Sequence, residues 1–373
     1  MKKINELIKK LCPNGVTFVK LEELCPVMRG KRLTKSQLSD DGQYVVYHGS
    51  KDTPLGFYED YNVEGDTVIV VNTGGIGGVK YIKDNFWCSD GSFWIKHNDK
   101  IDNKFLYYYL VQYEGYYLSQ KRVGGVPTID KSVVSNTRIP VPPLEIQKEI
   151  VNILDTFEEH ICSLKKELVL REKSYEAIMY QLLKKENFKN FDCLENYCYF
   201  EKGKTPIQKN TPGCYPLVAT TEHLQTSDNY QFDCEAVCLP LISARGHGVA
   251  SITRIYYQSG KFALGNILCA IIPKDNRIKA EFLRNYLFYH KDTLLVPLMR
   301  GGANVALTVD SLKKVQIPIP SIDEQQSIIE KLRVFQEIIS KEKGIPAEIE
   351  KRQQQYEYYR KKLLSFKEVE ENE

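Results

Sequence analysis

The sequence predicts an α+β protein with two tandem mixed domains, each followed by a long helix. The two helices are expected to pair as an antiparallel coiled coil with pseudo-two-fold symmetry. Three observations predict this architecture: motifs recur at a nearly constant offset, each half contains short segments rich in β-branched and aromatic residues, and each half ends in a long apolar seam with helical spacing. A chain of 373 residues has room for two or three domains.

The internal repeat is the strongest of these signals. Leu21-Glu22-x-x-Cys25 recurs as Leu194-Glu195-x-x-Cys198, at an offset of 173. Later pairs keep the same order, at offsets of 177, 178 and 181: Phe105-Leu106 with Phe282-Leu283, Gln147 with Gln325, and Tyr175-Glu176 with Tyr356-Glu357. Because the offset drifts in one direction only, we expect one unit of about 175 residues to be present twice.

Each repeat begins with a mixed region. The first region is preceded by an amphipathic helix predicted over residues 1–11. Strand-like composition predicts strands at 44–47, 67–71, 236–242, 251–257 and 267–272. The spacing of apolar residues predicts helices over 104–118 and 280–295. We expect the tyrosines of the first of these helices to pack in the core: Tyr107, Tyr108, Tyr109, Tyr113, Tyr116 and Tyr117.

A long helix is predicted to close each repeat. The first, over 144–185, would be about 63 Å long at 1.5 Å per residue. Its seam advances by three or four residues and has one polar position, Arg171. The seam residues are Ile146, Ile150, Ile153, Phe157, Ile161, Leu164, Leu168, Arg171, Tyr175, Ile178 and Leu182. The second helix is predicted over 322–366 with a break near Pro346, because proline interrupts helical hydrogen bonding.

Two proline-rich segments mark the domain boundaries. Ile-Pro-Val-Pro at 139–142 and Ile-Pro-Ile-Pro at 317–320 are expected to be extended, since proline restricts its own backbone and that of the preceding residue. We therefore predict a first mixed domain over 1–142, a central helix over 143–186, a second mixed domain over 187–320 and a distal helix over 321–373.

Composition excludes several classes of protein. The hydrophobic content of 42% and charged content of 27% are those of a soluble globular protein. The longest apolar run, 267–272, is far shorter than the roughly 20 residues that span a bilayer, and the N-terminus lacks the apolar core of a signal peptide. We expect a cytoplasmic protein without membrane contact. Ten cysteines without a C-x-x-C pair predict free thiols and no metal.

The chain resembles the DNA-specificity subunits of type I restriction-modification systems over nearly its whole length. The markers are Ile139-Pro140-Val141-Pro142-Pro143-Leu144-Glu145-Ile146-Gln147 and Ile317-Pro318-Ile319-Pro320-Ser321-Ile322-Asp323-Glu324-Gln325, each leading into a long helix and each preceded by a mixed domain. The resemblance implies a non-enzymatic subunit in which each mixed domain reads one half of a bipartite site in double-stranded DNA. It also implies that the helices set the spacer between the half-sites.

The resemblance further implies partners that carry the chemistry. The helices would dock two methyltransferase subunits, which would use S-adenosylmethionine to methylate adenine N6, and motor-nuclease subunits would join them in the full complex. This chain would hold no cofactor itself. Its sequence has no Asn-Pro-Pro-Tyr tetrapeptide, no Phe-x-Gly-x-Gly loop, no Pro-Asp pair and no complete P-loop. Two alternatives stay open: a coiled-coil scaffold without DNA binding, and a free-standing methyltransferase or nuclease.

Repeat-equivalent cations are the candidate DNA contacts. The short basic loops hold Arg29, Lys31 and Arg32 in one repeat and Lys202 and Lys204 in the other. Lysine and arginine beside glycine can approach phosphates closely, so we expect phosphate contacts here. The net charge of +3 means that such a basic surface is local.

Two further pairs of loops complete the candidate set. Glycine-rich turns lie at 74–79 and at 245–249, where the second contains Arg245 and His247. They fit DNA contact and tight hairpins equally well. Lys121 and Arg122 precede one Gly-Gly pair, as Arg300 precedes another that leads to Asn304. Arginine can bind a guanine edge and asparagine an adenine edge, so these side chains are candidates for base readout.

Overall fold

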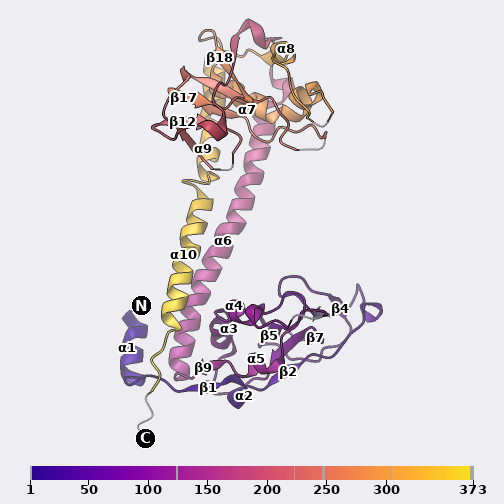
Figure 1. The fold of residues 1–373 in the computed structure, drawn as a ribbon, viewed down its shortest axis with the longest axis vertical. Helices are drawn as coiled ribbons and strands as arrows, with labels where there is room; N and C mark the ends of the chain where they lie inside the picture. Colours follow the sequence, from indigo (N-terminus) through magenta and orange to yellow (C-terminus); the bar gives the residue numbers. More distant parts are fainter. Residues whose placement is uncertain (1, 123–124, 222, 246–247, 303, 370–373) are drawn as a thin grey trace. The chain divides into compact units, whose positions relative to one another are not determined.

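The computed structural model describes residues 2–122, 125–221, 223–245, 248–302 and 304–369, and it divides into two compact units (Figure 1). Unit 1 comprises Met1–Leu164 and Ile349–Glu373, and unit 2 comprises Lys165–Glu348. Helix α6 (Leu144–Leu183) contributes its first half to unit 1 and its second half to unit 2. Each unit therefore combines one mixed domain with segments of two long helices.

Unit 1 contains a four-stranded and a three-stranded sheet. The first has the order β2 (Val27–Arg29), β8 (Ser92–Ile95), β5 (Thr67–Val71), β6 (Val79–Ile82). The second has the order β4 (Gly56–Tyr58), β3 (Tyr44–Tyr47), β7 (Phe86–Cys88), with β3 and β7 parallel. Helix α3 (Asn103–Val111) buries Phe105 and Leu106 in the same core as Val68 and Val70 of β5, so apolar strand and helix faces share one core.

Unit 2 repeats this strand order. Its sheets run β11 (Cys198–Lys202), β18 (Leu268–Pro273), β15 (Ala236–Pro240), β16 (Tyr256–Gln258) and β13 (Gln225–Ser227), β12 (Tyr215–Val218), β17 (Lys261–Leu264), β14 (Phe232–Asp233). Strands β12 and β17 are parallel, as β3 and β7 are in unit 1. Helix α7 (Ala280–Tyr289) takes the place of α3. The predicted duplication is confirmed at the level of sheet topology.

A two-stranded ladder closes each mixed domain. It pairs β1 (Phe18–Lys20) with β9 (Arg138–Pro140) in unit 1, and β10 (Phe191–Cys193) with β19 (Gln316–Pro318) in unit 2. The prolines stand at strand ends, where a missing N–H interrupts no ladder. The remaining elements are short: α1 (Lys2–Leu11), α2 (Leu21–Leu24), η1 (Lys35–Gln37), α4 (Glu114–Ser119), α5 (Lys131–Ser135), η2 (Lys185–Asn187), η3 (Leu194–Asn196), η4 (Ile207–Lys209), η5 (Lys291–Leu295), η6 (Val296–Leu298) and α8 (Val309–Lys313).

The long helices pair antiparallel inside each unit (Figure 1). In unit 1, Phe157 of α6 stacks on Tyr359 of α10 (Ile345–Leu363), with ring centroids 5.5 Å apart. In unit 2, the core contains Tyr175 and Met179 of α6 together with Ile329 and Leu332 of α9 (Ile322–Ile338). The predicted seam is therefore confirmed in part. Its buried members are Ile146, Ile150, Ile161, Leu164 and Tyr175, its half-buried members are Ile153, Phe157, Leu168, Ile178 and Leu182, and Arg171 is exposed.

The predicted break in the distal helix is confirmed. Residues 339–344 separate α9 from α10, and Pro346 lies in the first turn of α10, where its missing N–H costs nothing. A Cβ atom at Gly344 would lie 2.1 Å from the carbonyl oxygen of Ile338, so only glycine allows this close approach.

Three expectations need correction. The strand predicted over 251–257 is formed only at 256–258, because Ser251 instead bonds the preceding turn: its N–H donates to Ser243 Oγ at 3.0 Å, and its carbonyl accepts from Ala244 N at 2.9 Å. The helix predicted over 104–118 is two helices, α3 and α4. That over 280–295 is α7 followed by the π-turn η5. Packing of the tyrosine cluster is confirmed for Tyr108, Tyr109 and Tyr117, which are buried.

A buried glutamine fastens each mixed domain to its own long helix. The Asp102 N–H donates to Gln147 Oε1 at 2.7 Å, and Gln147 Nε2 donates to the carbonyls of Lys100 (3.0 Å) and Pro142 (2.7 Å). Gln325 repeats this clamp with Lys279 N (2.8 Å), Arg277 O (2.9 Å) and Pro320 O (3.0 Å). Both glutamines are fully buried. The loop before α3 or α7 is therefore fixed to the first turns of the helix that follows the domain.

We predict that Gln147→Ala destabilises the chain by about 3 kcal/mol, because it leaves a backbone donor and two carbonyls without partners in the interior. The change in unfolding free energy, measured by chemical denaturation, tests this. Gln353→Ala, at an exposed position of α10, is the matched control and should change stability by less than about 0.5 kcal/mol. Equal effects of the two substitutions would contradict the clamp.

Candidate nucleic-acid interface

The first basic loop is held against the turn between β7 and β8. A Cβ atom at Gly30 would lie 2.1 Å from the carbonyl oxygen of Ser89, so the backbone can pass here only as glycine. The Lys31 N–H donates to Cys88 O at 2.9 Å. The side chains of Arg29, Lys31 and Arg32 are exposed, and the Lys31 ammonium lies 5.9 Å from the centroid of the Trp87 ring. The loop thus presents three cations from a fixed backbone.

The second basic loop has the same backbone geometry. A Cβ atom at Gly203 would lie 2.1 Å from Gly265 O, and Thr205 N donates to Leu264 O at 3.1 Å. Lys202 and Lys204 are exposed. The Lys204 ammonium lies 3.0 Å from Glu201 Oε1, and this hydrogen bond, together with one from Gln231, lowers the pKa of Glu201.

The glycine-rich segment of unit 1 forms a tight turn. Gly74 and Gly77 have φ angles of +82° and +83°, and Gly75 N donates to Gly49 O at 2.7 Å. In unit 2, Gly248 has φ +79° and Arg245 is exposed. His247 lies outside the described residues. The hairpin interpretation is confirmed for residues 74–79, which join the antiparallel strands β5 and β6. For residues 245–249 it stays a prediction.

The candidates for base readout lie in loops closed by a pair of bridged residues. Arg122 N donates to Thr128 O at 2.8 Å, and the Arg122 guanidinium forms an ion pair with Asp130. Arg300 and Ala306 exchange two backbone hydrogen bonds of 2.8 Å. The Arg300 guanidinium donates to the carbonyls of Pro297 (2.6 Å) and Met299 (2.9 Å) in its own loop. Lys121 and Asn304 are exposed.

The structure brings the three predicted loops of unit 1 together. The β7–β8 turn contacts the basic loop through Gly30 N to Ser92 O (3.1 Å) and the glycine-rich turn through Thr73 N to Gly91 O (3.3 Å). Thr73 in turn forms a bridge with Thr128 of the third loop. We call this surface, formed by residues 29–32, 73–78, 121–122 and 125–128, edge 1.

Unit 2 assembles the equivalent loops in the same way. Gly203 N donates to Leu268 O and Leu241 N to Ile267 O, both at 2.9 Å, so one turn again holds two loops. Ser243 N donates to Val305 O at 2.9 Å and connects the third loop. We call the surface formed by residues 202–205, 243–245, 248–249, 300–302 and 304–306 edge 2. The same three-loop edge is therefore built twice in one chain.

The cations of the two edges differ in their availability. Arg29, Arg32, Lys121 and Lys202 form no ion pair with any residue that the structure describes. Lys204 and Arg122 are paired with Glu201 and Asp130, and such exposed pairs contribute only about 0–1 kcal/mol. An anionic ligand can therefore replace the carboxylate partner at low cost.

Sequence reasoning missed a recess beside each edge. The recess of unit 1 has a volume of about 330 Å³ and is lined by His48, Ser50 and Thr73 among others. Gly91 N donates to His48 Nδ1 at 3.2 Å and orients the ring. In unit 2 a recess of about 310 Å³ is lined by Ser243, Ser251 and Arg254. Neither His48 nor Arg254 belongs to a sequence motif, so only the folded structure identifies them.

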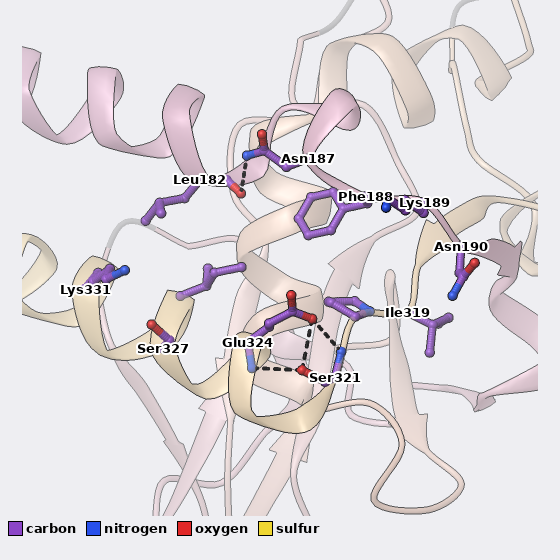
Figure 2. A pocket seen from close by; sticks show the side chains of 12 residues that line it. Leu182, Asn187, Phe188, Lys189, Asn190, Ile319, Ser321, Glu324, Ser327 and Lys331 are labelled. Carbon is purple, nitrogen blue, oxygen red and sulfur yellow. Dashed lines mark hydrogen bonds between the residues drawn. The ribbon is translucent and has the colours of Figure 1, made fainter.

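A larger recess, of about 510 Å³, lies away from edge 2 at the start of α9. Figure 2 shows Glu324 hydrogen-bonded to Ser321 at this helix start. Lys331 lies further along the same helix. In unit 1 the corresponding α6 residues, Ile146 and Ile150, are fully buried in a core that includes Ile4 of α1. The recess thus marks a position that α1 covers in unit 1 only.

The described part of the chain has neither a metal-binding cluster nor a membrane-spanning helix. Within the described ranges, no group of three His, Cys, Asp or Glu side chains is placed to hold a metal ion, and every cysteine is a free thiol. No described helix is both long and apolar enough to cross a bilayer.

Comparison with known proteins gives a consistent result. The family described as "Type I restriction modification DNA specificity domain" matches residues 13–170 and 185–351. The chain is 27% identical over 378 residues to a putative type I specificity subunit of Mycoplasma pneumoniae, covering 93% of this chain and 97% of that protein. It is 31% identical over 261 residues to the specificity subunit of the type I restriction enzyme EcoR124I/EcoR124II of Escherichia coli, covering 62% and 64%.

Solved structures share the fold. The crystal structure of a type I restriction-modification S subunit from M. genitalium has a TM-score of 0.68 at 18% identity, covering 94% of this chain and 96% of that one. A chain from a study of complex assembly and conformational transition of the type I R-M system has a TM-score of 0.56 at 19% identity, covering 94% and 98%.

Proposed function

The chain belongs to the type I restriction-modification DNA specificity family, and from this premise we propose that edge 1 and edge 2 each read one half of a bipartite site in double-stranded DNA. The observation that carries the proposal is the three-loop edge built twice, with exposed cations at repeat-equivalent positions. Two readers in one chain suit a site made of two separate half-sites.

We propose a division of labour within each edge. The exposed cations of the basic loops (Arg29, Lys31, Arg32, Lys202 and Lys204) neutralise phosphates, a contact that orients the protein and is independent of sequence. In this proposal Arg122 in edge 1 and Arg300 with Asn304 in edge 2 read base edges. For this, Arg122 exchanges Asp130 for a base, and Arg300 gives up two carbonyls of its own loop.

The long helices and the partners complete the proposal. The paired helices set the spacer between the half-sites and dock two methyltransferase subunits, and motor-nuclease subunits join in the full complex. S-adenosylmethionine binds only to the methyltransferase subunits. The chain itself is a non-catalytic subunit that acts in the cytoplasm, where the DNA is.

We predict that Lys31→Ala weakens binding to every DNA sequence. Loss of one phosphate contact should lower the slope of log affinity against log salt by about 0.9. Arg122→Ala should instead reduce discrimination in one half-site, by about 1–3 kcal/mol for the base concerned. Titrations at several salt concentrations, with the specific site and with variants of each half-site, measure both effects.

The matched control is Lys166→Ala on the exposed face of α6, outside both edges. It should leave affinity and salt slope unchanged. If Lys31→Ala and Arg122→Ala behave like this control, edge 1 is not the DNA surface.

We also predict that the purified chain transfers no methyl group from labelled S-adenosylmethionine to DNA. Addition of the cognate methyltransferase subunit should produce adenine methylation at one bipartite sequence. The methyltransferase subunit without this chain is the control and should give no site-specific product. Methyl transfer by the chain alone would refute the assignment of catalysis to the partner.

A further inference from the structure

Each mixed domain contacts its own long helix through polar side chains. In unit 1, the Lys104 ammonium of α3 lies 2.6 Å from Asp155 of α6. The Tyr108 hydroxyl donates to Asp155 at 2.6 Å and lies 3.1 Å from Glu158. We call Asp155 and Glu158 seat 1. This seat is acidic, and the domain that it holds presents a cation.

Unit 2 has the same contact with reversed charge. The Arg333 guanidinium of α9 donates to Glu281 of α7 at 2.6 Å. The Gln336 amide donates to Asn285 Oδ1 at 3.1 Å. We call Arg333 and Gln336 seat 2. In this seat Arg333 is positively charged and Gln336 is neutral. The domain that it holds presents an anion, Glu281.

The two contacts occupy equivalent positions of the repeat. Lys104 and Glu281 are offset by 177, as are the matched phenylalanines Phe105 and Phe282 that follow them. Asp155 and Arg333 are offset by 178, as are the clamp residues Gln147 and Gln325. The reversal therefore inverts one ion pair at equivalent positions of the repeat.

A tyrosine from the second helix of each unit completes the seat. The Tyr356 hydroxyl of α10 donates to Glu158 at 2.8 Å, and Tyr175 of α6 accepts from Gln336 at 2.9 Å. These tyrosines are also repeat equivalents. The carboxylates are largely sheltered, with side-chain exposures of 25% for Asp155 and 15% for Glu281. Charges here are screened less than charges in open water.

We propose that the charge of each seat selects the recognition domain that it accepts. Seat 1 accepts a domain with a cation at the position of Lys104, and seat 2 accepts one with an anion at the position of Glu281. A domain in the wrong place would set Glu281 against Asp155 and Glu158, or Lys104 against Arg333. Like charges at such a distance oppose docking.

The ladders and the glutamine clamps, which also join each domain to its helix, show no such difference in charge. The ladders β1–β9 and β10–β19 have the same antiparallel pairing of three residues, and the glutamine clamps use the same atoms. These backbone contacts therefore do not distinguish the two domains, and the order of the chain places the first domain before α6 and the second before α9. The charge of each seat adds a side-chain preference for the domain that the chain order brings to it.

A charge-reversal cycle in the full chain tests the selection. Lys104→Glu and Asp155→Arg should each raise the unfolding equilibrium constant of the chain about three- to tenfold, and the double variant should reverse most of this rise. Glu281→Lys and Arg333→Asp form the same cycle in unit 2. Lys166→Glu, on the exposed face of α6, is the control and should change little. If the effects of the two single reversals simply add in the double variant, the proposal is wrong.

A domain exchange tests the selection directly. Residues 21–137 and 194–315 are exchanged between the two ladders, and the exchanged chain should unfold at a lower temperature than the natural chain. Asp155→Arg, Glu158→Gln, Arg333→Asp and Gln336→Glu introduced together should restore much of the loss. An exchanged chain as stable as the natural one, or one that the seat substitutions do not improve, would overturn the proposal. The unfolding measurements use no DNA, so they stand or fall independently of the proposed function.

Discussion

The buried amide at the start of each long helix is the contact on which the rest of the structure depends. Gln147 and Gln325 each bond three backbone groups, and they lie where the mixed domain passes into its helix. A buried amide that satisfies three groups is costly to disturb. The edges are therefore carried on a domain that cannot turn freely on its helix.

The periodic features of the sequence predicted most of the frame. The heptad-like seam predicted α6, and the Gly-Ile-Pro sequence predicted the break before α10, because both depend on local backbone chemistry. The repeat predicted that the basic loops are equivalent, and the close contacts at Gly30 and Gly203 agree. The strand predicted over 251–257 was mostly wrong, because the hydrogen bonds of Ser251 to the preceding turn, at Ser243 and Ala244, were not visible in local composition.

The sequence predicted which loops form the edges, but not which partners their charged side chains have. Lys204 and Arg122 were expected to be available cations, whereas the fold places Glu201 and Asp130 beside them. His48 and Arg254 border the recesses without any motif, since the segments that frame each recess are separate in the sequence. Partners of this kind depend on tertiary proximity, and one sequence without its fold carries no signal for them.

Comparison of the two repeats separates what the backbone requires from what the side chains are free to change. Glycine at positions 30 and 203 and glutamine at positions 147 and 325 occur in both copies, because a Cβ atom or a lost amide would disrupt the same backbone contacts. Other equivalent positions differ in polarity: Ile146 is buried in the core that includes α1, whereas Glu324 is exposed and caps α9. A duplicated frame with independent surfaces allows two readers to diverge in sequence preference without loss of the geometry that joins them.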